Sequence, residues 1–174
     1  GSLQDVTEKV KATDRLHFLA EHDPLTGILN RRGIEKEFDE AVAMLGDGVS
    51  MSLAYLDLDR FKLINDLFGH LAGDEVLKQV CERVRNMLTE GQSMGRVGGD
   101  EFVIVFKGTP IDSAAWVCRG IVDRIGNLPY QIGDRAFQVK GSIGLMEISE
   151  SIRVKDAISV ADRACREAKS GNHG

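Results

Sequence analysis

Arg96-Val97-Gly98-Gly99-Asp100-Glu101-Phe102-Val103-Ile104-Val105-Phe106 is the stretch around which the rest of the chain is organised. Gly98-Gly99 favours a two-residue hairpin turn, because glycine adopts positive φ without steric cost. The apolar and β-branched run that follows is typical of a buried strand. We therefore expect residues 92–97 and 101–106 to form a hairpin that holds Asp100 and Glu101 where the chain leaves the core. An ordinary polar turn is the alternative interpretation of the Gly-Gly-Asp segment.

A second carboxylate cluster, Asp57-Leu58-Asp59, follows another apolar run, residues 51–56. Two unit charges about 4 Å apart repel each other by roughly 4 kcal/mol at an effective dielectric constant of about 20. Two such clusters brought together at strand ends need a cation, a proton or a greater separation. Hard divalent cations with oxygen ligands suit this composition best. The clusters therefore predict a metal site, and a strand-end cap is the alternative role for Asp57.

The composition excludes several classes of protein. The chain has 174 residues, of which 43% are hydrophobic and 28% charged, as expected for one globular domain. A net charge of −5 argues against a nucleic-acid binder that relies on phosphate neutralisation. No run of 18 apolar residues occurs, so we expect no membrane contact by this segment. Cys81, Cys118 and Cys165 lie in apolar helical patterns, which predicts core packing without disulfides in a reducing, cytoplasmic compartment.

Hydrophobic periodicity predicts a helix, a strand, two helices, two strands, a helix, two short strands, a strand and a final helix. Hairpins mixed with crossover helices favour an α+β fold with a mixed, mainly antiparallel central sheet flanked by helices. Residues 1–22 are expected to form a linker or signalling helix, with Gly1-Ser2 resembling an expression tag, and residues 23–174 a single domain. Residues 69–73 are expected to form a turn, so that Asp74 begins the long helix after it.

Cap chemistry sets the expected starts of two other helices. Thr26 or Asn30 would cap the first helix of the domain, and Asp112 or Ser113 a later one. The spacing of apolar residues in that later helix places Trp116 on its buried face.

Several short segments, in order along nearly the whole chain, resemble the GGDEF family, the diguanylate cyclases. Together they are far more specific than any single segment. The segments are Asp23-Pro24-Leu25-Thr26-Gly27-Ile28-Leu29-Asn30-Arg31-Arg32, Asp57-Leu58-Asp59-Arg60-Phe61-Lys62, Asn65-Asp66, Gly69-His70, Gly73-Asp74, and Gly98 to Phe102. Members of this bacterial signalling family condense two GTP molecules into cyclic di-GMP and release two pyrophosphates. The resemblance implies a fold similar to nucleotidyl cyclase and polymerase palm domains.

The resemblance also implies a Mg²⁺ site, with Mn²⁺ as an alternative ion, held by Asp57, Asp100 and the backbone carbonyl of Leu58. Glu101 is implied either as a ligand of a second metal ion or as a group that helps to activate the ribose hydroxyl. Attack of a 3′-hydroxyl on an α-phosphate needs an activated nucleophile and a neutralised phosphate charge, which one or two such ions supply.

Phosphate binding is implied at two places. Backbone N–H groups of Arg60, Phe61 and Lys62 can form an anion-binding turn at a helix start, and the Lys62 side chain would add catalytic charge unless it is simply solvated. Lys169 resembles the phosphate-binding lysine of the family's terminal helix, with a plain surface lysine as the alternative. The family usually continues to an arginine, whereas this chain reads Ser170-Gly171-Asn172-His173. Either phosphate binding is weaker or His173 substitutes.

The guanine base is implied to lie between two further groups. By resemblance, Asn65 and Asp74 read its edge, since an amide and a carboxylate offer complementary acceptors and donors; helix capping is the alternative role. Gly98 and Gly99 would let the backbone approach the nucleotide closely, because a Cβ atom there would intrude.

Many relatives carry Arg-x-x-Asp shortly before the Gly-Gly pair, and this motif forms an inhibitory product site. The corresponding positions here are Thr89 and Gln92. Neither supplies the guanidinium fork that binds guanine or phosphate well. We therefore expect no high-affinity inhibition by cyclic di-GMP through this stretch.

If one domain holds one GTP, two domains must meet face to face, so catalysis needs a homodimer. Residues 5–9 resemble the tail of a PAS sensor domain running into a signalling helix, so an upstream sensor and a downstream domain are expected partners in the full-length protein.

The alternative function is a weak or silent GTP-sensing module that regulates an attached domain such as a cyclic di-GMP phosphodiesterase. The missing arginine after Lys169 favours this alternative slightly, and intact Asp57, Asp100 and Glu101 favour the active enzyme more.

Overall fold

A computed structural model describes residue 16 and residues 18–171, so the expected helix over residues 1–22 lies mostly outside the described residues. The order of helices and strands is the predicted one. No helix in the described residues has the length and apolar character needed to span a membrane. The elements are α2 (Arg31–Ala43), β1 (Met51–Asp59), α3 (Phe61–Phe68), α4 (His70–Arg85), β2 (Gln92–Arg96), β3 (Glu101–Phe106), α5 (Ile111–Gly126), β4 (Tyr130–Ile132), β5 (Arg135–Phe137), β6 (Lys140–Ile148) and α6 (Val154–Gly171).

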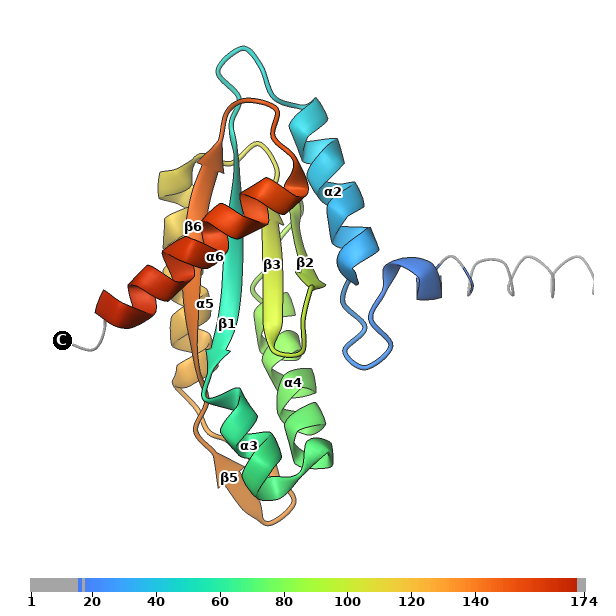
Figure 1. The fold of residues 1–174 in the computed structure, drawn as a ribbon, viewed down its shortest axis with the longest axis vertical. Helices are drawn as coiled ribbons and strands as arrows, with labels where there is room; N and C mark the ends of the chain where they lie inside the picture. Colours follow the sequence, from blue (N-terminus) through green and yellow to red (C-terminus); the bar gives the residue numbers. More distant parts are fainter. Residues whose placement is uncertain (1–15, 17, 172–174) are drawn as a thin grey trace, which may run out of the picture.

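The main sheet has four strands in the order β2-β3-β1-β6, and every neighbouring pair is antiparallel. The long strand β1 lies between β3 and β6 and is buried over residues 51–56. The β4–β5 hairpin forms a separate two-stranded sheet at the end of the molecule where α3 lies (Figure 1). The predicted α+β fold with a mainly antiparallel sheet is confirmed.

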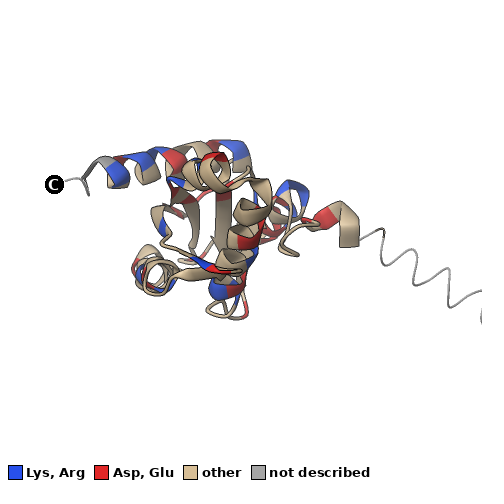
Figure 2. Cartoon of the chain, turned by 90° about the horizontal axis from the view of Figure 1, so that it is seen from below, with Lys and Arg blue, Asp and Glu red and all other residues tan. Residues whose placement is uncertain are grey.

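Helices cover both faces of the sheet, α2 and α6 on one side and α4 and α5 on the other (Figures 1 and 2). Successive residues of a strand point to opposite faces, and β1 follows this rule. Met51, Leu53 and Tyr55 pack in the core under α2 and α6, whereas Leu56 and Leu58 pack in the core under α4 and α5. The same alternation determines the face of the sheet on which the last side chains of β1 lie.

The cap of α2 is Asn30, whose side-chain oxygen accepts a hydrogen bond of 2.9 Å from the Gly33 N–H. The expected Asp112 or Ser113 cap of α5 is wrong, because α5 begins directly after Pro110. The N–H of Ile111 instead donates to the carboxylate of Glu147 on β6, at 2.6 Å.

Trp116 is not buried as expected, since 75% of its surface is exposed on the outer side of α5. The buried face of α5 consists of smaller residues that include Cys118. The predicted core packing of the cysteines is confirmed, because Cys81, Cys118 and Cys165 are all buried, and all three thiols are free.

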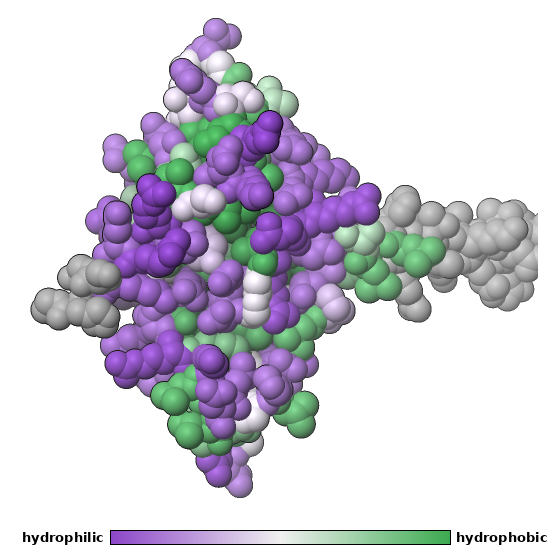
Figure 3. Space-filling view, viewed as in Figure 1, coloured by the Kyte–Doolittle hydropathy of each residue, from purple (hydrophilic) through white to green (hydrophobic). Residues whose placement is uncertain are grey.

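The helix α4 begins at His70 and not at Asp74, so residues 70–73 are helical rather than a turn. Gly69 alone separates α3 from α4, with a φ of 90° that suits glycine. Exposed apolar residues gather at this end of the molecule (Figure 3), where Leu63, Leu67 and Leu71 are each at least half exposed.

Candidate functional site

The carboxylates of the two predicted clusters meet at one end of the sheet. Asp57 on β1 lies directly opposite Glu101 on β3 in the antiparallel register, and directly opposite residues share a face. Because Tyr55 packs under α6, the alternation of β1 places Asp57 and Asp59 on that same face. Three of the four acidic side chains therefore converge beside α6, at the strand ends.

The Gly98-Gly99 turn differs from the expected two-residue turn. Four residues, Val97 to Asp100, connect β2 and β3, and neither glycine has positive φ. The N–H groups of Val97 and Gly98 both donate to the carbonyl of Glu101, at 2.9 and 3.2 Å. A Cβ atom on Gly98 would lie 2.6 Å from the Glu101 carboxylate, whereas one on Gly99 would meet open space. A side chain at Gly98 would therefore displace the Glu101 carboxylate from its present position.

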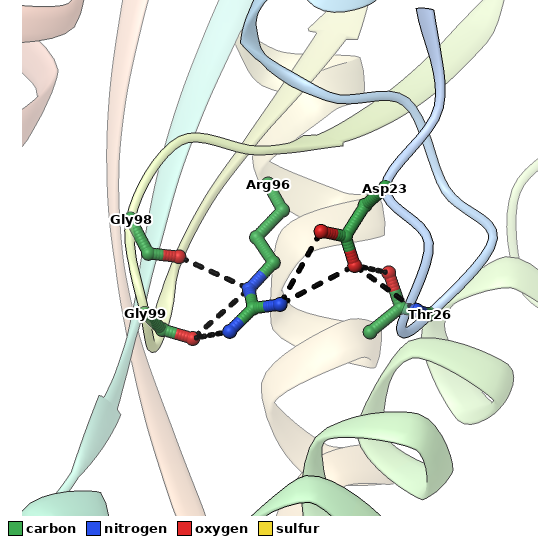
Figure 4. A network of polar contacts seen from close by, with 5 residues as sticks. All are labelled: Asp23, Thr26, Arg96, Gly98 and Gly99. Atoms are coloured by element: carbon green, nitrogen blue, oxygen red, sulfur yellow. Dashed lines mark hydrogen bonds and ion pairs between the residues drawn. The ribbon is translucent and has the colours of Figure 1, made fainter. Parts of the chain in front are cut away.

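Arg96 holds this turn in place, together with Asp23 near the start of the domain (Figure 4). The guanidinium donates to the carbonyls of Gly98 and Gly99 at 2.9–3.2 Å and to both Asp23 carboxylate oxygens at 3.3 Å. Asp23 also accepts hydrogen bonds from the Thr26 N–H and hydroxyl, at 2.9 and 2.7 Å. Although burial opposes it, these Thr26 bonds and the Arg96 charge keep the pKa of Asp23 below its usual value.

Sequence reasoning did not assign this role to Arg96. The available signal was local: an Asp three residues before a Thr is typical of a turn in which the carboxylate accepts the Thr N–H. The partner in the Gly-Gly turn could not be read from that pattern, because Asp23 and Arg96 are 73 positions apart.

Asp100 follows Gly99 and is half buried just before β3. Burial, the nearby charge of Asp57 and the charge of Glu101 together raise the pKa of Asp100. The N–H of Leu58 donates to the Asp100 carbonyl at 3.4 Å, so the backbone of Leu58 faces the same turn. The expected metal-binding groups Asp57, Leu58 and Asp100 therefore lie together.

The donor set fits a hard divalent cation in its chemistry, because carboxylate and carbonyl oxygens are the ligands that Mg²⁺ takes. Burial, and then the charges of Asp57 and Glu101, raise the pKa of Asp100, so a bound cation would favour its ionised form. Within residues 18–171, no three His, Cys, Asp or Glu side chains are arranged as a metal centre. The ammonium group of Lys169 lies next to the acidic residues of β1.

Lys169 lies in the last turn of α6 and contacts both acidic residues of β1. Its ammonium donates to Asp57 at 2.9 Å and lies 3.0 Å from Asp59. Burial opposes the effect, but these two carboxylates raise the pKa of Lys169. Asp59 accepts a further hydrogen bond of 3.2 Å from the Ser142 hydroxyl on β6. The contact of Lys169 with Asp59 was not predicted.

The predicted phosphate-binding turn, Arg60 to Lys62, has an unusual backbone. Arg60 adopts the left-handed conformation, with φ 59° and ψ 24°, which is rare for a residue other than glycine. It precedes α3, whose N-terminus has no side-chain cap. The Leu63 N–H donates to the Arg60 carbonyl at 3.1 Å, which leaves the N–H groups of Phe61 and Lys62 for a ligand. Local strain of this kind is typical of functional sites. Phe61 is buried, whereas Arg60 and Lys62 are exposed.

Asn65 on α3 lies against α4 at Gly73, the position just before Asp74. The Asn65 side chain lies so close to Gly73 that a Cβ atom on Gly73 would be 1.8 Å from the Asn65 amide oxygen. Gly73 precedes Asp74, and both Asn65 and Asp74 are half buried. Since Asp74 lies within α4, the alternative that it caps this helix is wrong.

Thr89 and Gln92, at the positions of the product-binding motif of relatives, bond to each other. The Thr89 N–H donates to the Gln92 side-chain oxygen at 3.0 Å, and the Gln92 N–H donates to the Thr89 carbonyl at 3.1 Å. The Gln92 side chain is therefore used in a turn.

Residues 20–174 match the family described as "Diguanylate cyclase, GGDEF domain". The chain is 32% identical over 174 residues to the probable diguanylate cyclase DgcE of Escherichia coli K12, covering 99% of this chain and 16% of DgcE. It is 34% identical over 171 residues to the cyclic di-GMP phosphodiesterase PdeR of the same organism, covering 98% of this chain and 26% of PdeR. The chain thus spans about a quarter or less of either relative.

The fold is similar to the crystal structure of the coiled coil and GGDEF domain of DgcB from Caulobacter crescentus in complex with c-di-GMP. The TM-score is 0.88 at 25% identity, over 98% of this chain and 91% of that chain. The expected likeness to palm-type nucleotidyl cyclase domains is confirmed. Because the family match covers nearly the whole sequence, the chain belongs to the GGDEF family of diguanylate cyclase domains.

Proposed function

We propose that this domain, residues 23–174, is a diguanylate cyclase module that condenses two GTP molecules into cyclic di-GMP and releases two pyrophosphates. The observation that carries the proposal is the convergence of Asp57, Asp100 and Glu101 at one end of the sheet, next to the uncapped start of α3. Acidic residues that collect beside a free helix N-terminus suit a metal–triphosphate complex. Three free cysteines agree with a cytoplasmic setting.

The substrate would be held by its two ends. The N–H groups of Arg60, Phe61 and Lys62 would receive the β- and γ-phosphates, with the Lys62 and Lys169 ammonium groups adding charge. Further along α3, Asn65 would pair with the guanine edge together with Asp74 on α4.

Asp57, Asp100 and the Leu58 carbonyl would hold Mg²⁺ or Mn²⁺, which when bound neutralises phosphate charge and favours ionisation of the attacking hydroxyl. Glu101 lies opposite Asp57. Burial, together with the nearby Glu101 carboxylate, raises the pKa of the Tyr55 phenol. We assign Glu101 one of two roles, a ligand of a second ion or a group that accepts the proton of the 3′-hydroxyl.

The reaction needs two domains. In each half, the 3′-oxygen of one GTP forms a bond to the α-phosphorus of the other, the bond from that phosphorus to pyrophosphate breaks, and the hydroxyl proton is lost. One domain supplies binding groups for one nucleotide, so the second nucleotide must be presented by a second copy. A two-fold arrangement would place each nucleotide opposite the other. An upstream sensor and a downstream domain are proposed partners of this dimer in the full-length protein.

A GTP-sensing module without turnover is the second candidate, favoured by the 34% identity to a protein named as a cyclic di-GMP phosphodiesterase. To separate the two, the domain is fused behind a parallel coiled coil and incubated with GTP and Mg²⁺. Chromatography should show cyclic di-GMP, and the Asp100→Asn variant of the same fusion should form none while its circular dichroism spectrum is retained. GTP binding without any product in the parent fusion would support the sensor and refute the cyclase.

We also propose that cyclic di-GMP does not bind tightly at Thr89 and Gln92. Their side chains include no guanidinium, and that of Gln92 already accepts the Thr89 N–H. Isothermal titration of the domain with cyclic di-GMP should show no high-affinity event. Tight binding that the double substitution Thr89→Ala/Gln92→Ala abolishes would contradict the proposal.

A further inference from the structure

Lys169 has a contact that phosphate binding does not explain. Its ammonium is shared between two carboxylates on β1, at 2.9 Å from Asp57 and 3.0 Å from Asp59. About a quarter to a third of each of these three side chains is exposed, so solvent reaches the group. The charge of this ammonium is already compensated by two carboxylates, so Lys169 is not a free anion-binding group in this state.

The two carboxylates differ in what else holds them. The Ser142 hydroxyl lies 3.2 Å from both oxygens of Asp59, and Ser142 is itself buried. The Ser142 carbonyl accepts a contact of 3.2 Å from the Cys165 thiol, which ties this part of β6 to α6. Asp59 is therefore held in place by neighbouring groups on β6 and α6. Asp57, in contrast, lies at the strand end opposite Glu101, where the proposed cation would bind.

We propose that Lys169 is the resting counter-ion of Asp57, that a divalent cation displaces its ammonium from Asp57, and that Asp59 then retains it beside the site. This inference rests on the proposed metal and nucleotide site. Asp59 is accordingly a positioning residue, because it acts on the reaction only through Lys169.

The charge balance of the site and the length of the lysine side chain both support this exchange. Without a cation, Asp57, Asp59, Asp100 and Glu101 lie close together, and the Lys169 charge reduces their mutual repulsion. A divalent ion at Asp57 would repel the ammonium, since like charges at close range are unfavourable. The four-carbon stem of lysine lets the ammonium shift without movement of α6, and its contact with Asp59 would survive the shift.

The test measures metal affinity in the absence of nucleotide. Free Mn²⁺ is followed by electron paramagnetic resonance during titration of the wild-type domain, Lys169→Met and Lys155→Met. Lys155→Met removes the same charge from an exposed lysine at the other end of α6. We expect Lys169→Met to bind Mn²⁺ about two- to fivefold more tightly, the range that a partly exposed ion pair supports. Lys155→Met should leave the affinity nearly unchanged, because distant exposed charges are screened.

Equal or weaker Mn²⁺ binding by Lys169→Met, with thermal melts showing a folded protein, would overturn the counter-ion role. A wild-type domain that binds neither Mn²⁺ nor a non-hydrolysable GTP analogue with Mg²⁺ would refute the proposed function itself. Binding of both by the wild type, without a gain in Lys169→Met, would refute only this inference.

The proposed retention of the Lys169 ammonium by Asp59 is tested by a double-mutant cycle. Affinity for the GTP analogue with Mg²⁺ is measured for Asp59→Asn, Lys169→Met and the double variant. If Asp59 acts through Lys169, Asp59→Asn should weaken binding in the wild type and have little effect once Lys169 is removed. Additive losses would show that Asp59 acts independently of Lys169.

Discussion

Replacing Gly73 with alanine should separate the stability of the domain from its affinity for guanine nucleotides. Gly73 lies inside α4, and in a helix interior alanine is favoured over glycine by about 1 kcal/mol. The new Cβ atom would lie 1.8 Å from the Asn65 amide oxygen, 2.9 Å from its carbonyl carbon and 3.2 Å from the tip of the Phe61 ring. The closest contact is with the end of a side chain, which can rotate away.

The two effects on stability oppose each other. The gain in helix propensity is about 1 kcal/mol, and the loss comes from moving the Asn65 amide and slightly displacing Phe61. We therefore expect the free energy of unfolding, from urea denaturation, to stay within about 1 kcal/mol of the wild-type value. Binding should respond differently, because the displaced amide can no longer face the guanine edge. Hydrogen bonds worth about 1.5–3 kcal/mol would be lost, which weakens GTP binding by roughly ten- to a hundredfold.

The assay is calorimetric titration with a non-hydrolysable GTP analogue and Mg²⁺, and it needs two companions. Gly120→Ala on α5 also replaces a helical glycine, with only the flexible end of Met87 within 4 Å, at 3.0 Å, and should leave binding unchanged. Asn65→Ala should weaken binding as much as Gly73→Ala, and the double variant should be no worse than either. Wild-type affinity in Gly73→Ala, with the fold intact, would show that Asn65 does not read the base.

Three further substitutions test the packing and charges of the site. Gly144→Ala should lower the free energy of unfolding by about 3 kcal/mol in urea, because its Cβ atom would lie 2.1 Å from a backbone oxygen of α6, which cannot rotate away. Because the pKa of Asp23 is lowered in the folded state, the stability contributed by its carboxylate is fully present above the unfolded pKa, near 4, and is lost as the pH falls through the folded pKa. Asp23→Asn should therefore be less stable than the wild type at pH 7, and its Tm should fall less steeply in acid. The raised pKa of Asp100 has the opposite effect on stability, because its charged form is disfavoured in the folded state. Asp100→Asn should therefore raise the Tm of the metal-free domain at pH 7. This gain should shrink as the pH falls through the folded and then the unfolded pKa of Asp100. An unchanged or lower Tm for Asp100→Asn at pH 7 would contradict a folded state that disfavours the charged form of Asp100 through burial and neighbouring acidic groups.

Short-range sequence patterns were sufficient to predict the sheet and the strand ends at which the acidic residues lie. The apolar run of β1 and the β-branched run of β3 define buried strands, and residues at the ends of paired strands must meet. Asp57 and Glu101 were found in this way. The cap at Asn30 was also accessible, because it depends on a side chain three residues from its partner.

The failures occur where a distant contact decides a local conformation. Gly98-Gly99 suggested a tight turn with positive φ, but Arg96 and the Glu101 carbonyl stabilise a wider connection without it. Trp116 fitted a helical stripe, yet the sheet accepts the smaller residues of α5. The contact between Lys169 and Asp57 spans 112 positions, so no local pattern could reveal it.

The charge balance of the site depends on how closely α6 approaches β6. Gly144 on β6 permits backbone contact with α6 at a distance that any side chain would prevent. At this crossing, the Cys165 thiol contacts the Ser142 carbonyl, and the Ser142 hydroxyl holds Asp59. One turn further along α6, Lys169 reaches Asp59 and Asp57. A change that lifts α6 from β6 would therefore withdraw the ammonium from both carboxylates without altering any acidic residue. It follows that substitutions in this packing should change the affinity for Mn²⁺ in the same direction as Lys169→Met, although they lie outside the proposed ligands.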